Sequence, residues 1–258
     1  MTYCLGILTS GGLVMAADSR TNAGVDYIST HQKLHDFSLP GERVILLCTS
    51  GNLSVTQAVI TLLRRDLKAR EDVNLQTLPT LYEVARYIGS KMRLIQEQDR
   101  PWLQKDGIDA SCSFLLGGQI RGEDPELYLI YSQGNCIQAS RETPFLQIGE
   151  AKYGKPILDR VLTSTTPLED AAKCALLSID STMKSNISVG PPIHLVMYEA
   201  NTYKIHYELR LAANASYLVQ IRNQWEACLK DAFDRMPNVD WEHYLDPDLP
   251  EDVLAEQS

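Results

Sequence analysis

The first residue with an evident chemistry is Thr2, which directly follows Met1. A threonine that becomes the first residue carries its own base. Its α-amine has a pKa of roughly 7.7–8.0, so near neutral pH the amine is largely available to take the hydroxyl proton. Such a nucleophile requires removal of Met1 and a chain end held firmly in a sheet, and the β-prone residues of MTYCLGIL suit that anchor. A threonine that merely begins an edge strand is the alternative at this point.

Other catalytic signatures are missing from the sequence. It contains no G-x-S-x-G, H-E-x-x-H, Walker or G-x-G-x-x-G motif. His31 and His35 are four residues apart, which could begin a metal site on a helix, but their segment is short and strand-like and has no evident carboxylate partner. The cysteines include no Cys-x-x-Cys pair. We therefore expect no metal and no other cofactor.

Hydrophobic periodicity predicts the elements that must position these residues. Alternating or continuous apolar runs predict strands, and apolar residues that recur at helical spacing predict helices. The predicted strands are 3–8, 12–19, 29–37, 43–50, 112–120, 126–134, 135–149, 193–200 and 203–211. The predicted helices are 53–70, 78–98, 155–162, 167–185 and 216–235, with a loop over 100–110.

The order of these elements indicates the fold class. Strands linked as hairpins come in blocks, which favours antiparallel sheets, and pairs of helices separate the blocks. This order suits an α+β fold, a four-layer αββα sandwich of two antiparallel sheets flanked by helices. We expect residues 1–236 to form this single domain and residues 237–258 to form an acidic C-terminal extension.

Composition restricts the classes of partner. The chain has 258 residues, of which 44% are hydrophobic and 22% charged, as is typical of a globular protein. No apolar run approaches the roughly 20 residues of a membrane helix and no secretory signal is evident, so we expect a cytoplasmic protein without a membrane partner. The net charge of -9 comes with no basic face for nucleic acid. The acidic end, which includes Trp241, Tyr244 and Leu245, is either a disordered tail or an arm that docks on a neighbour.

Several short motifs resemble one enzyme family. The segments AADSRTNAG and LLCTSGN, with Lys33 between them, resemble the β-subunit family of the proteasome, which belongs to the N-terminal nucleophile hydrolases. Within that family, MTYCLGI, DSRTNAGVDYIST, IGEAKYGKPILDR and the acidic extension are similar to the Anbu branch, the bacterial ancestral beta subunit or proteasome-type protease. The resemblance covers most of residues 2–236 and implies the αββα fold.

The resemblance also implies catalytic roles. Thr2 matches the nucleophile freed by removal of Met1. Lys33 matches the lysine whose charge lowers the proton affinity of the threonine site, and Asp18 matches the acid that orients this lysine. Gly51 matches the glycine whose backbone N–H stabilises the oxyanion of the tetrahedral intermediate.

Two positions depart from the family pattern. Many proteasome β subunits carry G-S-G where this chain reads IGEA, which places Glu150 at the serine position. They carry D-x-x-S-G where this chain reads NISVG, with Asn186 and Ser188 as approximate counterparts. The resemblance therefore adds Glu150 and Ser188 to the catalytic set. The acid either replaces the hydrogen bonding of the serine, adapts the site to another substrate, or weakens it.

The substrate-binding residues are predicted from strand periodicity. If residues 31–35 form a strand, His31, Lys33 and His35 share one face, and both histidines border the pocket beside Thr2. Thr49 and Leu53 are expected on the opposite wall. Because a histidine donates hydrogen bonds and gains charge below a pKa of roughly 6.5, this pocket should accept a polar or acidic side chain.

The sequence thus predicts a proteasome-type threonine peptidase that hydrolyses peptide bonds in peptide or protein substrates. The resemblance implies that it assembles with copies of itself, as a ring or as an open-ring or helical homo-oligomer. An amidohydrolase that acts on a small or unusual amide would share Thr2, and a non-catalytic proteasome-like assembly subunit is a further alternative. An unfoldase partner cannot be identified from the sequence.

Overall fold

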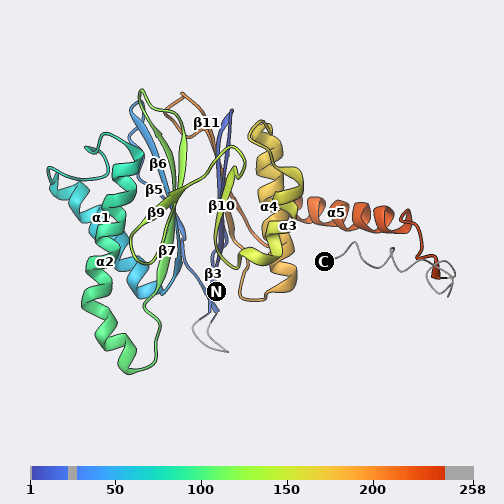
Figure 1. The fold of residues 1–258 in the computed structure, drawn as a ribbon, viewed down its shortest axis with the longest axis horizontal. Coiled ribbons are helices and arrows are strands. Elements are labelled where there is room, and N and C mark those ends of the chain that lie inside the picture. Colours follow the sequence, from blue (N-terminus) through green and yellow to red (C-terminus); the bar gives the residue numbers. More distant parts are fainter. Residues whose placement is uncertain (1, 23–27, 242–258) are drawn as a thin grey trace, which may run out of the picture.

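A computed structural model of the chain describes residues 2–22 and 28–241. In these residues, two five-stranded antiparallel sheets lie face to face between layers of helices (Figure 1). Helices α1 (Leu53–Ala69) and α2 (Leu81–Lys105) cover one outer face, and α3 (Ala151–Val161) and α4 (Leu168–Ser185) cover the other. The predicted four-layer αββα sandwich is confirmed.

The first sheet contains the N-terminal strand as an internal strand, second from one edge. Its strand order is β10-β1-β2-β11-β12. The strands are β1 (Tyr3–Thr9), β2 (Gly12–Ala17), β10 (Phe145–Gly149), β11 (Ile193–Glu199) and β12 (Tyr207–Leu211). Cys4 stands opposite Ala17 on one side and Ile148 on the other, so the start of the chain is paired along both edges.

The second sheet has the order β5-β6-β7-β8-β9. Its strands are β5 (Leu34–Asp36), β6 (Arg43–Gly51), β7 (Cys112–Ile120), β8 (Glu126–Ile130) and β9 (Cys136–Gln138). A separate two-stranded ribbon joins β3 (Arg20–Asn22) to β4 (Ile28–Thr30). The helices α1 and α2 separate β6 from β7 in the sequence, although the two strands are neighbours in the sheet.

Strand alternation distributes the apolar side chains over three core layers. Tyr3, Leu5 and Ile7 of β1 pack toward α3 and α4, while Cys4 faces the other sheet. Successive side chains of a strand point to opposite faces, so alternate residues of β1 enter different core layers. Because both faces of the strand are covered, nearly all of its residues are apolar. The middle layer, between the sheets, contains Leu46 and other residues that point inward from both sheets.

Local signals explain the helix ends near the sheet edges. The Asn52 side chain accepts hydrogen bonds from the Ser54 and Val55 backbone N–H groups and thereby caps α1. Thr80 and Glu83 form a reciprocal capping box at the start of α2. The last helix, α5 (Ser216–Asp234), extends away from the body of the molecule, and Leu218 is its buried residue (Figure 1).

Two predicted strands are each divided between different sheets. Segment 29–37 is interrupted at residues 31–33, because its first part pairs with β3 as β4 and its second part pairs with β6 as β5. Segment 135–149 likewise becomes β9, paired with β8, and β10, paired with β1 of the other sheet. Pro144 precedes β10 and has no N–H to donate to a ladder. Periodicity reports an extended backbone but not the partner strand, which is why both predictions were wrong.

The predicted loop over 100–110 is also wrong in its first half. Helix α2 continues through Pro101 to Lys105. A proline removes only one backbone N–H from a helix, and because Pro101 and Trp102 are exposed, water can reach the carbonyl that loses its partner. The remainder of the segment, which is a loop, returns the chain to β7.

Within the described residues, none of the helices is long and apolar enough to cross a membrane. Of the aromatic and apolar residues noted near the C-terminus, Trp241 is exposed. Tyr244 and Leu245 lie outside the described residues, so the division at residue 237 stays a prediction.

Candidate active site

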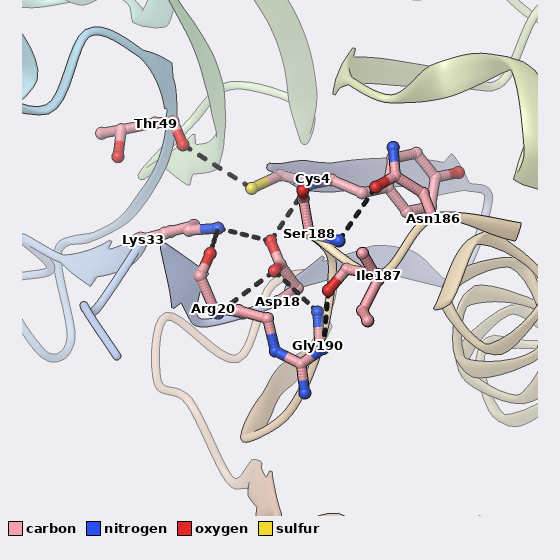
Figure 2. A network of polar contacts seen from close by, with 10 residues as sticks. Cys4, Asp18, Arg20, Lys33, Thr49, Asn186, Ile187, Ser188 and Gly190 are labelled. Atoms are coloured by element: carbon pink, nitrogen blue, oxygen red, sulfur yellow. Dashed lines mark hydrogen bonds and ion pairs between the residues drawn. The ribbon is translucent and has the colours of Figure 1, made fainter. Parts of the chain in front are cut away.

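The strongest polar feature near the start of the chain is a buried ion pair between Asp18 and Lys33. The Lys33 Nζ lies 2.7 Å from Asp18 Oδ1, and the two side chains are 5% and 0% exposed (Figure 2). The same Oδ1 accepts a hydrogen bond of 3.0 Å from the Tyr3 N–H. Oδ2 accepts bonds of 3.2 Å from the Arg20 N–H and 3.1 Å from the Gly190 N–H. The carboxylate is therefore fixed by donors on several sides.

Lys33 is held as firmly as Asp18. Its Nζ also donates to the Arg20 carbonyl oxygen at 2.6 Å, and its own carbonyl accepts from the Thr49 N–H at 2.9 Å. Lys33 is the last residue of the short segment 31–33 that connects β4 to β5. Its hydrogen bond with the Thr49 N–H attaches this segment to β6. An ammonium group in this position has little freedom to reorient.

Burial and ion pairing act in opposite directions on Asp18. Burial raises the pKa of the Asp18 carboxyl, and the charge of Lys33 opposes the rise. The backbone N–H groups of Tyr3 and Gly190 also favour the ionised carboxylate. Removing either member of the pair would leave the other charge largely buried and without its counter-charge.

Thr2, the residue before β1, is positioned by contacts of the main chain. Its carbonyl oxygen accepts a hydrogen bond of 2.8 Å from the Glu150 N–H. Gly149 makes this approach possible, because it has a φ of +84° and a Cβ at that position would overlap the Thr2 carbonyl. The next residue, Tyr3, donates its N–H to Asp18, so Thr2 lies between two fixed contacts.

The residues around Thr2 enclose a cavity of about 790 Å³, here called the Thr2 cavity. Of the residues predicted from the sequence, Thr2, Lys33, Thr49, Gly51, Leu53 and Glu150 line it. Gly51 ends β6 with a φ of +100°, and an added Cβ would overlap the Ser111 carbonyl. The segment that follows α2 therefore passes so close to position 51 that only glycine fits there.

Ser188 lies in the loop that packs beside Asp18 rather than in the described lining of the Thr2 cavity (Figure 2). The Ser188 N–H donates to Asn186 Oδ1 at 2.9 Å. Arg20 Nη1 donates to the Ile187 carbonyl at 2.6 Å, and Gly190 contacts Asp18 as described above. This loop therefore supports the ion pair from the side of α4.

The two histidines line a second cavity of about 330 Å³, here called the Arg64 cavity after the arginine at its α1 side. It shares Lys33, Thr49, Leu53 and Thr56 with the Thr2 cavity. His31 and His35 therefore lie next to the Thr2 cavity, but not as neighbours on one strand face, because the chain leaves its strand at residues 31–33.

His35 gains its charge at a lower pH than the roughly 6.5 expected from the sequence. Burial lowers the pKa of the buried His35 to about 4, and the charges of Arg64 and His194 act in the same direction. His35 Nδ1 lies 3.4 Å from Arg64 Nη2. Because a guanidinium group can only donate, Nδ1 is the acceptor and the neutral ring carries its proton on Nε2.

Sequence reasoning missed several lining residues. Asp109 and Ser111 reach the Thr2 cavity from the loop after α2, where the Asn52 N–H donates to the Ser111 carbonyl at 2.9 Å and Asn52 Nδ2 to the Asp109 carbonyl at 2.9 Å. Arg64 lies on the exposed side of the predicted helix, where a charged residue gives no signal of a site. Within the described part of the chain, no cluster of three or more His, Cys, Asp or Glu residues is arranged to hold a metal.

Comparisons with known proteins agree with this geometry. Residues 2–198 match the family profile described as proteasome subunit. No curated protein matched the chain. Among solved structures, Anbu (ancestral beta-subunit) from Yersinia bercovieri is 44% identical with a TM-score of 0.87, and the match covers 93% of this chain and 99% of that one.

Two further structures are similar over nearly the same length. The helical assembly of the Anbu complex from Pseudomonas aeruginosa is 46% identical with a TM-score of 0.88, covering 92% of this chain and 98% of that one. Anbu from Hyphomicrobium sp. strain MC1 is 45% identical with a TM-score of 0.84, covering 93% and 100%. Its fold, its N-terminal cavity and these matches show that the chain belongs to the proteasome subunit family, and the three solved structures named here are Anbu proteins.

Proposed function

We propose that this chain is a threonine-type peptidase that uses Thr2 as an N-terminal nucleophile after removal of Met1. The observation that carries the proposal is the position of Thr2 at one cavity with Lys33, whose ammonium is buried and paired with Asp18. A fixed positive charge beside a hydroxyl lowers the proton affinity of that hydroxyl. Membership of the proteasome subunit family supports a hydrolase of this type.

The proposed reaction proceeds in two halves. The Thr2 Oγ attacks the carbonyl carbon of the scissile peptide bond, and the Thr2 α-amine accepts the hydroxyl proton, which later passes to the leaving amine. Water then attacks the resulting ester, releases the carboxylic acid product and restores the Thr2 hydroxyl. Throughout, Lys33 keeps the local potential positive, and Asp18 holds Lys33 in place.

Three further residues have supporting roles in this proposal. The Gly51 N–H stabilises the oxyanion of the tetrahedral intermediate. Glu150, whose N–H already holds the Thr2 carbonyl, occupies the serine position of many relatives and lines the Thr2 cavity, where its carboxylate is proposed to accept from the freed α-amine. Ser188 supports the ion pair from the loop beside Asp18.

The substrate and the assembly follow from the same proposal. His31, His35, Thr49 and Leu53 are proposed to contact the substrate, since they line the Thr2 cavity or the cavity next to it. We also propose homo-oligomers, either rings or open helical arrangements, because the Pseudomonas aeruginosa relative is described as a helical assembly. A cytoplasmic location stays a prediction.

The proposal is tested first on the purified full chain. Intact mass and N-terminal sequencing should show a chain that starts at Thr2. A β-lactone probe should label wild type and not Thr2→Ala, and Thr2→Ala should have no turnover on a panel of fluorogenic peptides. Thr165→Ala, an exposed threonine outside both cavities, is the control and should behave as wild type.

Three outcomes separate the alternatives. Full activity of Thr2→Ala on the best substrate would contradict the threonine mechanism. Labelling of Thr2 without cleavage of any peptide would indicate an amidohydrolase for a small or unusual amide. Retained Met1 together with absent labelling would indicate a non-catalytic assembly subunit.

A further inference from the structure

The Arg64 cavity has an unusual charge composition. Of the described residues that line it, none is aspartate or glutamate, whereas Lys33, Arg64 and two histidines are present. The Thr2 cavity beside it differs, because Asp109 and Glu150 line that space. The excess of positive charge is therefore local to the smaller cavity.

Arg64 is the cation that is available to a ligand. The charge of Lys33 is paired with Asp18 at 2.7 Å, but among the described residues Arg64 forms no ion pair with a carboxylate. Its guanidinium is held by His35 Nδ1 at 3.4 Å, and its Cζ lies 6.0 Å from the centroid of the Phe37 ring. Neither contact neutralises its charge, and neither requires all of its N–H groups.

The remaining lining suits a carboxylate on a short aliphatic stem. Leu53 and Ile60 provide apolar contact, and Thr61 and Gln57 provide polar groups close to Arg64 on the same helix. A guanidinium recognises a carboxylate with two parallel N–H bonds, which a carboxamide of the same shape cannot match. Neutral His35 adds an Nε2–H donor in place of a second charge.

We infer that the Arg64 cavity binds the acidic side chain of the substrate residue whose carbonyl Thr2 attacks, and that Arg64 determines this specificity. The inference rests on the proposed function, because the two cavities share Lys33, Thr49 and Leu53 and the residue attacked at Thr2 can place its side chain in the smaller space. Peptide bonds that follow glutamate or aspartate are the resulting substrate class.

The turnover experiment compares peptide aminomethylcoumarins that end in glutamate, glutamine or leucine and are otherwise identical. Wild type should prefer glutamate over glutamine by roughly tenfold or more in kcat/KM, as expected for a hydrogen-bonded charge pair. Arg64→Gln should abolish this preference, and Arg64→Lys should restore part of it. Arg65→Gln is the matched control, because Arg65 is the next residue on α1, is 68% exposed, pairs with Asp66 and does not line the cavity.

A binding experiment separates this inference from the peptidase proposal. The Thr2→Ala protein, with and without Arg64→Gln, is titrated calorimetrically with acetylated tetrapeptide amides, so that the glutamate side chain is the sole carboxylate. Arg64-dependent binding of the glutamate peptide, together with no turnover of any peptide by wild type, would refute the peptidase and support the Arg64 cavity as a site for an acidic side chain. Thr2-dependent turnover with equal rates for glutamate and glutamine would overturn the inference and keep the peptidase. Glutamate binding that is unmeasurable at millimolar peptide, or unchanged by Arg64→Gln, would also overturn it.

Discussion

Replacing Lys33 by methionine should destabilise the protein far more than the same change in an exposed ion pair. The substitution keeps most of the side-chain volume and removes the charge beside Asp18, whose carboxylate is 0% exposed. At the observed 2.7 Å and an effective dielectric constant of about 20, the attraction between the two charges is about 6 kcal/mol. Part of this is offset by the cost of burying the charges, so the net loss expected on removing one partner is about 3 kcal/mol.

The structure explains why the loss is not larger. After Lys33→Met, Asp18 still accepts hydrogen bonds from the N–H groups of Tyr3, Arg20 and Gly190. Asp18→Asn should cost a similar amount, because it removes the charge that balances the buried Lys33 ammonium and places an amide NH2 group where a carboxylate oxygen accepted N–H donors. The double variant removes both charges, so its loss should be about 2–3 kcal/mol smaller than the sum of the two single losses.

The matched control is the pair formed by Lys173 and Asp170 on α4. Its N···O distance is also 2.7 Å, but its side chains are 54% and 51% exposed. In water the same attraction is strongly screened, and the side-chain entropy lost on pairing offsets most of what remains. Lys173→Met should therefore have a small effect.

The assay is urea unfolding followed by intrinsic fluorescence at one fixed protein concentration, because any self-association adds to the apparent stability. The reasoning is refuted if Lys33→Met costs less than about 1 kcal/mol, if it matches Lys173→Met, or if the two single losses add in the double variant. Additive losses would mean that Asp18 and Lys33 contribute to stability separately rather than as a pair.

Two further predictions concern His35 and Gly149. Because the pKa of His35 is lowered from 6.5 to about 4, the unfolded chain binds a proton there before the folded chain does, so stability is lost as pH falls below 6.5. Between pH 7.5 and pH 5 the free energy of unfolding should fall by about 2 kcal/mol because of this group. Urea unfolding at the two pH values should show that His35→Gln lacks this loss, whereas the control His206→Gln, changed at an exposed histidine, retains it. An equal pH dependence of wild type and both variants would disprove the lowered pKa of His35. Gly149→Ala should lower turnover at least tenfold by displacing the Thr2 carbonyl, whereas Gly122→Ala, with a φ of +90° and open space around it, should lower only stability, by about 1 kcal/mol. Similar peptide turnover in the two glycine variants would contradict that role of Gly149.

Much of the fold could be predicted from local sequence. The runs over 53–70, 112–120 and 167–185 carry their own periodicity, and the structure places α1, β7 and α4 almost on those bounds. The blocks of strands and helices also indicated the αββα arrangement, because each amphipathic element must cover an apolar face. The motif around Thr2, Asp18, Lys33 and Gly51 indicated the chemistry, and its roles stay proposals.

What tertiary structure alone decided is which distant residues meet. Periodicity could not tell that segment 135–149 crosses from one sheet to the other, since an extended backbone has the same alternation whichever strand it pairs with. The approach of Asp109 and Ser111 to Gly51 depends on the pairing of β6 with β7 across two intervening helices. The sequence indicates only that Arg64 is a solvated helix residue, whereas the fold brings it into contact with His35. Local sequence therefore determined the elements and the nucleophile to test, while burial and long-range contact determined the charge of the cavity beside it.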